Sequence, residues 1–121
     1  MKFLNSVKPL FLEDNKVFER LVREAVENIP EFFIQYMTNL EIKIEDDNEQ
    51  QLLGIFEGIP LIDRYNGQSY LPDVITIYEK PLIEISNSTE ELKVNIRETV
   101  LHEVAHYFGI DDEDLEKMGK Y

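Results

Sequence analysis

The 121-residue sequence contains no cysteine and no run of apolar residues long enough to cross a bilayer. The lack of cysteine excludes a disulfide scaffold and any metal site built on thiolates. Polar residues and a proline interrupt residues 1–9, so this stretch does not have the apolar segment of a signal peptide. We therefore expect an intracellular protein, located in the cytoplasm.

Basic residues are also scarce, because 12 lysines and arginines stand against 25 acidic residues and leave a net charge of −13. Such a charge repels nucleic acid and anionic membrane, so we expect neither as a partner. It also argues against a metal-dependent nuclease. The charge attracts metal ions and basic peptides only diffusely, and solubility is its simplest consequence.

The length fits one compact domain over residues 1–121, and 43% hydrophobic residues is ordinary for a globular protein. The first part of the chain has apolar residues at helical spacing. It predicts a helix that Asp14 or Asn15 caps and Pro30 ends, followed by a second helix over 31–37.

The middle of the chain has the alternation and the β-branched residues of strands. The predicted strands cover 40–45, 52–57 and 74–78, and a long loop covers 59–72.

The last part of the chain returns to helical spacing. Ser88 and Glu91 have the form of a capping box at the start of a long helix, and Gly109 ends that helix. Asp111 or Asp112 can cap a short final helix. The order of helices, then strands, then helices predicts the α+β class.

The predicted long helix contains His102, Glu103 and His106 in an H-E-x-x-H motif. Residues four apart lie about 40° apart around a helix and one turn apart along it, so both imidazoles can reach one metal ion. Glu103 lies about 100° round from His102, too far to be an easy ligand but able to approach a metal-bound water. A zinc ion lowers the pKa of that water to roughly 7, and a carboxylate can then take its proton.

The rest of the helix supports a site at the motif, because polar residues form a narrow stripe there. Within about 60° of His102 lie Asn95, Glu98, Thr99, His106 and Gly109. The opposite arc is apolar and carries Val94, Ile96, Val100, Leu101, Val104, Ala105 and Phe108. The alternative is that the stripe is simply the solvent face of the helix. Against that alternative, the only two histidines of the chain are both in the motif.

A catalytic zinc site needs a third protein ligand and one open position. Gly109 lets the chain turn sharply, and an acidic residue just past the turn can return to the metal. Asp111 and Asp112 are the fifth and sixth residues after His106. Either aspartate can bind the metal or cap the final helix, and the two roles can be divided between them.

The pattern H-E-x-x-H-x-x-G-x-x-D, formed by His102, Glu103, His106, Gly109 and Asp112, resembles the short-motif zincins. More closely, the chain resembles the minimal zincin family of small bacterial zinc metallopeptidases. The similarity extends from about residue 17 to residue 119. The segments that carry it besides the motif are 53–60, 71–78 with 81–82, and 97–101.

The resemblance implies a small mixed β-sheet packed on helices, one of which carries the zinc ligands. It implies Zn²⁺ held by His102, His106 and Asp112, with Glu103 as the general base, and it favours Asp112 over Asp111. We therefore predict a zinc metallopeptidase that hydrolyses a peptide or protein substrate, although the family brings no defined substrate. The alternative is a zinc-stabilised binding or regulatory module with little or no turnover, which a fourth protein ligand would favour. Nothing in the sequence indicates an oligomeric state.

Other residues are weaker candidates for a role in the site. Zincins stabilise the oxyanion with a side chain besides the metal, and the candidates here are Arg64, Tyr65, Tyr70 and Tyr78. Each of them is more simply explained as a structural or exposed residue. The strand at 74–78 is either an edge strand that pairs with an extended substrate or an internal strand. Met118 is best interpreted as a core residue.

Overall fold

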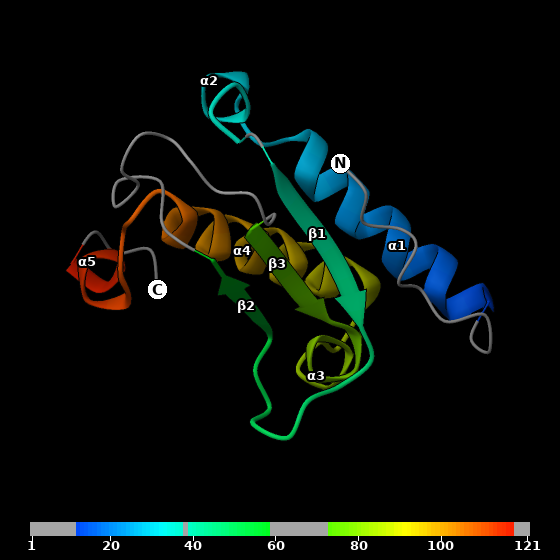
Figure 1. Ribbon diagram of the computed structural model, residues 1–121. Coiled ribbons are helices and arrows are strands. Elements are labelled where there is room, and N and C mark those ends of the chain that lie inside the picture. The colour runs from blue at the N-terminus through cyan, green and yellow to red at the C-terminus, as the bar shows by residue number, and fades with distance from the viewer. Residues whose placement is uncertain (1–11, 38, 59–72, 118–121) are drawn as a thin grey trace.

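The computed structural model describes residues 12–37, 39–58 and 73–117 (Figure 1). Within these residues, helices, strands and again helices follow one another as predicted, so the class is α+β. None of the described helices is long and apolar enough to span a membrane. The elements are α1 (Leu12–Glu27), α2 (Glu31–Ile34), β1 (Leu40–Glu45), β2 (Gly54–Glu57), β3 (Asp73–Tyr78), α3 (Glu79–Glu84), α4 (Thr89–Tyr107) and α5 (Asp112–Lys117).

The three described strands form one mixed sheet in the order β1-β3-β2. β1 pairs with β3 in parallel, with Leu40 opposite Asp73. β2 pairs with β3 in antiparallel orientation, with Gly54 opposite Ile77. β3 is therefore the central strand, which decides between the two alternatives for residues 74–78 in favour of an internal strand. The strand at the edge beside β3 is β2.

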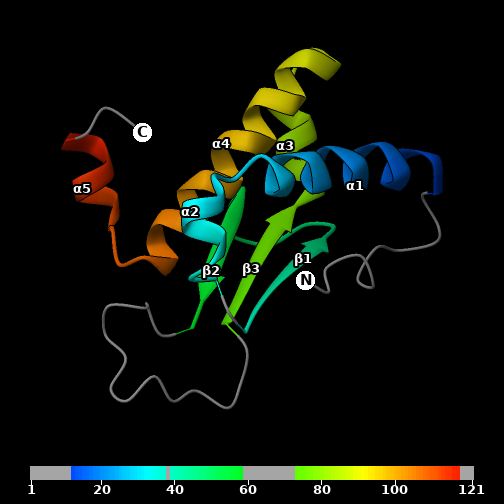
Figure 2. The ribbon, with the colours of Figure 1, turned by 90° about the horizontal axis from the view of Figure 1, so that it is seen from above.

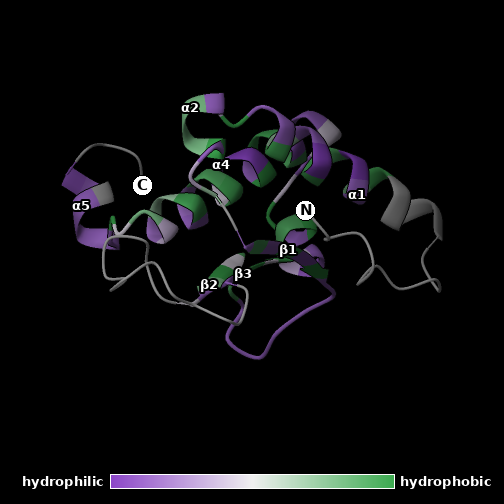
Figure 3. Cartoon of the chain, turned by 45° about the horizontal axis from the view of Figure 1, so that its top comes forward, coloured by the Kyte–Doolittle hydropathy of each residue, from purple (hydrophilic) through white to green (hydrophobic). Residues whose placement is uncertain are grey.

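The helices α1 and α4 lie on the same face of the sheet (Figures 2 and 3). Alternation along β1 buries Leu40, Ile42 and Ile44 in the core, while the residues between them stay half-buried. Helices and strands share one hydrophobic core. Its fully buried side chains are Phe18, Val22, Ile42, Ile75, Ile77, Leu82, Ile96, Val100 and Tyr107.

Local sequence signals set both ends of α4, as predicted. The Ser88 hydroxyl accepts a hydrogen bond from the Glu91 N–H at 3.1 Å. The Glu91 carboxylate in turn accepts from the N–H of Asn87 at 2.7 Å, one residue before the position that a capping box uses. At the other end, Gly109 has a φ of 86°, a left-handed conformation that glycine adopts without steric cost.

Several boundaries differ from the predictions; β3, for example, begins at Asp73 instead of residue 74. α1 begins at Leu12, so Asp14 and Asn15 lie inside the helix and not at its N-cap position. α2 ends at Ile34 instead of residue 37, and β2 begins at Gly54 instead of residue 52. The loop predicted over 59–72 lies outside the described residues.

Two features of the helices were not predicted. Residues Glu79–Glu84 form α3, in which Pro81 is tolerated because N–H groups of a first turn have no partner within the helix. Val94 and Leu101 on α4 are 45% and 44% exposed, although both belong to the apolar arc of the helix. They are seven residues apart and so lie on one side of the helix, beyond the part that the core covers.

The edge strand β2 lies against α4 at Gly54. A Cβ atom at this position would lie 2.9 Å from Cγ2 of Thr99 and 3.1 Å from the carbonyl oxygen of Thr76. It would also lie 3.4 Å from Cγ of Glu103. Glycine therefore allows the close approach of strand and helix that places β2 beside the motif.

Replacing Gly54 by alanine should lower the free energy of unfolding by about 1–3 kcal/mol, because the added methyl group overpacks the contact between β2 and α4. Thr99→Ser removes Cγ2 but keeps the hydroxyl that donates to the Asn95 carbonyl at 2.8 Å. The double variant should therefore recover part of the loss. Urea denaturation of the metal-free proteins measures both. A Gly54→Ala protein as stable as the parent would show that strand and helix separate without cost.

Candidate metal centre

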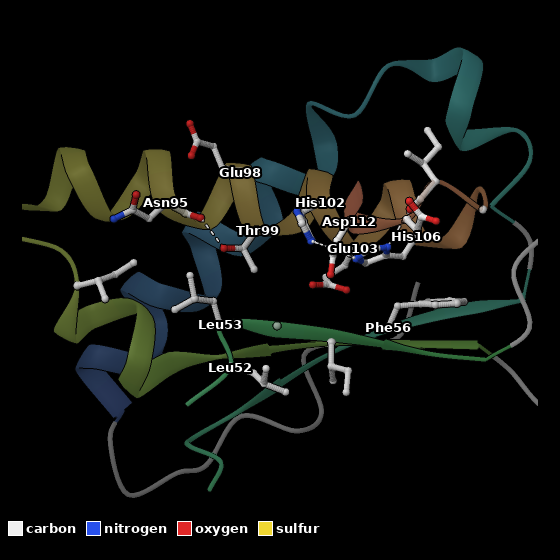
Figure 4. Close-up of a pocket in the computed structure, with 16 residues that line it drawn as sticks. Leu52, Leu53, Phe56, Asn95, Glu98, Thr99, His102, Glu103, His106 and Asp112 are labelled. Atoms are coloured by element: carbon white, nitrogen blue, oxygen red, sulfur yellow. Dashed lines mark hydrogen bonds and ion pairs between the residues drawn. The ribbon is translucent and has the colours of Figure 1, made fainter. Parts of the chain in front are cut away.

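The polar stripe of α4 faces a cleft of about 770 Å³ between this helix and β2 (Figure 4). Every member of the stripe lines the cleft: Asn95, Glu98, Thr99, His102, His106 and Gly109. The stripe is therefore not merely an open solvent face, which was the alternative interpretation. The apolar side of the same helix, with Ile96 and Val100 fully buried, holds the stripe in this orientation.

Three side chains with metal-binding atoms come together at one part of this cleft. Oδ1 of Asp112 lies 2.9 Å from Nε2 of His102 and 3.0 Å from Nε2 of His106. One ligand atom from each of the three residues lies within 4.8 Å of those of the other two. The four-residue spacing on α4 supplies the histidines, and Figure 4 shows Asp112 beside them. The chain turns at Gly109, between the histidines and Asp112.

A hydrogen bond to a nearby backbone carbonyl determines the tautomer of His106. Nδ1 of His106 lies 2.9 Å from the carbonyl oxygen of Ile110, which can only accept a hydrogen bond. Nδ1 therefore carries the proton and donates. The lone pair of neutral His106 is then on Nε2, the atom that faces Asp112, as it is in histidines that bind metals.

The two aspartates after Gly109 have different surroundings. The Asp111 carboxylate accepts a hydrogen bond from the N–H of Asp114 at 2.8 Å, so it caps α5. Asp112 is the first residue of that helix, and its carboxylate points back to the histidines. Capping and proximity to the histidines are thus divided between the two residues.

Glu103 lines the same cleft, although it is only 6% exposed. Burial raises the pKa of its carboxyl group to about 7, against the opposing effect of nearby His106. The charge of Asp112 raises the pKa further, while a hydrogen bond from the backbone N–H of Phe56 on β2 lowers it. The general-base candidate is therefore held between the helix and the edge strand, next to the three donors.

The donor set fits a zinc ion. Two imidazole nitrogens and one carboxylate oxygen are ligands that zinc commonly takes, and three protein ligands leave a fourth position open. Within the described ranges, the cluster of potential metal ligands has these three members and no fourth. The donors also border a cleft, so a ligand could reach the open position.

The other predicted candidates do not join this group. Tyr78 ends β3, and it is absent from the described lining of the cleft. Burial raises the pKa of its hydroxyl, and the charges of Glu57 and Glu45 add to the rise. The remaining oxyanion candidates Arg64, Tyr65 and Tyr70, and the core candidate Met118, lie outside the described residues.

Sequence reasoning missed the apolar part of the cleft. Leu52 and Leu53, just before β2, and Ile85, at the C-terminus of α3, line it with the polar stripe. The two leucines were assigned to a strand. A signal was present in the turn formed by Asn48, whose side chain exchanges hydrogen bonds with the backbone of Leu52 and so delays the start of β2.

Comparison with known protein families matches residues 25–120 to the family described as zincin-like metallopeptidase. Among solved structures, a conserved hypothetical protein from Thermo thermophilus is similar, with a TM-score of 0.53 and 23% sequence identity. That match covers 86% of this chain and 95% of the other, and at this identity it supports the fold alone. The comparison with curated proteins found no match. Because the family match spans most of the sequence, including the whole H-E-x-x-H motif, this chain belongs to the zincin-like metallopeptidases.

Proposed function

We propose that this chain is a zinc-dependent peptidase in which His102, His106 and Asp112 hold the metal and Glu103 is the general base. The observation that carries the proposal is the convergence of Oδ1 of Asp112 on the Nε2 atoms of both histidines. Membership of the zincin-like family supports zinc as the metal and peptide-bond hydrolysis as the reaction.

Each residue has a defined part in this chemistry. Bound zinc supplies a Lewis acid that polarises a carbonyl and lowers the pKa of a water to roughly 7. Glu103 takes a proton from the attacking water and returns it to the leaving amine. The N–H of Phe56 orients the Glu103 carboxylate, and Ile110 orients the ring of His106. Both groups that orient these side chains, the N–H of Phe56 and the carbonyl of Ile110, belong to the backbone.

The cleft supports an enzyme over a metal-stabilised binding module. The three donors line it together with Glu103, and the described cluster contains no fourth protein ligand that would close the site. Gly54, Ile55 and Phe56 of β2 form the other side of the cleft. Within the described sheet β2 pairs on one side only, so an extended peptide is a suitable substrate for this position.

The metal assignment is tested by composition. Purified protein loaded with zinc and freed of excess should hold about one zinc per chain, because one set of three donors is available. The His102→Ala, His106→Ala double variant should hold none, since it keeps one donor of three. Elemental analysis with a circular dichroism spectrum of each protein makes the measurement. Full zinc content in a folded double variant would remove the histidines from the site.

The two neighbouring aspartates provide a matched pair for the third ligand. Asp112→Ala should weaken zinc binding at least tenfold, because the zinc loses one of three protein ligands. Asp111→Ala should leave zinc affinity nearly unchanged and cost about 1 kcal/mol of stability, the typical cost of a lost helix cap. Competition with a chromogenic chelator gives the affinities. The opposite order of effects would assign the ligand to Asp111, and no effect from either would place the third ligand elsewhere.

Glu103→Gln separates metal binding from hydrolysis. The variant should keep its zinc and lose at least about 99% of turnover, because an amide cannot take the proton and general bases contribute roughly 10²–10⁴-fold. Wild type and variant are incubated with a mixed peptide library, and mass spectrometry identifies the products. The double histidine variant, purified in parallel, controls for contaminating peptidases. Equal cleavage by wild type and Glu103→Gln would exclude Glu103 as the base.

A further inference from the structure

The short helix α5 stands apart from the rest of the described molecule. Figures 1 and 2 show it beyond the C-terminal end of α4, away from the sheet and from α1. Every side chain of α5 that the structure describes is exposed: Asp112, Glu113, Asp114, Glu116 and Lys117. Four of these five side chains are acidic, in a chain whose net charge is −13, so electrostatic repulsion works against holding α5 on the protein. Burial of these side chains therefore does not fix the position of α5.

The hydrogen bonds and ion pairs of α5 are mostly local. One hydrogen bond joins its first turn to the carboxylate of Asp111, and an ion pair joins Lys117 to Glu113 one turn earlier. Among the residues that the structure describes, the hydrogen bonds and ion pairs that join α5 to another element all involve the carboxylate of Asp112. Their partners are the two histidines of α4, so α5 is attached to the protein through the candidate metal centre.

The chain is fixed to α4 only as far as Ile110. The N–H of Ile110 donates to the carbonyl of Ala105 at 2.9 Å, and its own carbonyl accepts from Nδ1 of His106. The Asp111 side chain instead accepts a hydrogen bond from α5. Rotation about the backbone of Asp111 would therefore move α5 and Asp112, while the residues up to Ile110 stay in place.

The contact of Asp112 with the histidines is weak unless a cation is present. Nδ1 of neutral His106 carries the ring proton, so Nε2 presents a lone pair to Oδ1 of Asp112 at 3.0 Å, and the two groups repel each other. Nε2 of His102, at 2.9 Å from the same oxygen, can donate one hydrogen bond when it carries a proton. The Asp112 side chain is 60% exposed, so this bond stabilises little. A divalent metal ion would turn the repulsion into attraction, because the nitrogen and the carboxylate can both bind it.

We propose that α5 is an arm that the metal ion holds in place. The arm docks when the two histidines and Asp112 bind a metal, and it swings away about Asp111 when they do not. Asp111 and Asp112 both line the cleft, so release of the arm also removes part of the wall beside the metal. Metal binding thus completes the cleft as well as the zinc centre. The inference rests on the proposed function, because it assigns a form of regulation to the same metal site.

Distances between spin labels test the arm directly, because the chain has no cysteine and introduced cysteines are labelled selectively. The labelled pair is Glu116→Cys on α5 and Glu90→Cys near the start of α4, which replace exposed residues outside the cleft. Pulsed double electron–electron resonance is recorded at about pH 8, where histidines are typically neutral, on the zinc-loaded protein and after a chelator has removed the metal. The zinc-loaded protein should give one narrow distance. The metal-free protein should give a distribution at least about twofold broader, as expected for a segment released from its contacts.

Two controls separate docking of α5 from other effects of zinc. A second pair, Glu27→Cys on α1 with Glu90→Cys on α4, joins two elements that share the core, so zinc should not change its distances. In the first pair, Asp112→Ala should keep the distribution broad even in excess zinc, because α5 then carries no ligand. Glu113→Ala makes the same charge change on an exposed residue of α5 that does not line the cleft, so zinc should still narrow the distribution.

Three results would overturn the proposal. The first is equal widths of the α5 pair with and without zinc, since other contacts, or none, would then determine where α5 lies. The second is broadening of the control pair on removal of zinc, because the metal would then order the whole fold. The third is equal broadening by Asp112→Ala and Glu113→Ala, which would assign the effect to the charge of α5.

Cleavage of the peptide library by the wild-type zinc protein separates this inference from the proposed function. Cleavage together with widths that do not depend on zinc would remove the arm and leave the peptidase standing. Widths that depend on zinc, without any cleavage, would retain the arm and contradict the peptidase.

Discussion

The packing of one side of α4 against the core is the contact on which the candidate site depends. Ile96 and Val100 are fully buried on that side, and the buried Tyr107 donates from its hydroxyl to the Tyr36 carbonyl at 2.9 Å. A helix fixed in this way cannot rotate without exposing apolar surface. The polar stripe must therefore face β2, so packing against the core determines which way the part of α4 that carries the histidines is turned.

Much of the fold could be predicted because its signals are local. The bounds of β1 follow from alternation, and the ends of α4 follow from Ser88 and Gly109. Some features could not be predicted because contacts distant in sequence decide them. No local signal shows that β3 takes partners on both sides, or that the core stops short of Val94 and Leu101 on α4. The helix α3 was not predicted, because its six residues include a proline and are too few for a helical period to be recognised.

The sequence predicts some residues of the candidate site better than others. Spacing alone brings His102 and His106 to one side of a helix, as the structure has them. The sequence could not separate Asp111 from Asp112 without the family resemblance, because the difference lies in which carboxylate reaches the N–H of Asp114. The burial of Glu103 could not be predicted from the sequence either, because it results from the approach of β2 to α4.

The three proposed metal ligands lie within eleven consecutive residues, from His102 to Asp112. The sheet instead joins Leu40 to Asp73, 33 positions later in the chain. An ion bound by these three residues would close a loop of only eleven residues. It would therefore restrict few of the conformations that the unfolded chain can adopt. The long-range order comes from the core and the strand pairing, unlike in small domains that need zinc to fold. We therefore expect the protein to fold whether or not a metal ion is bound.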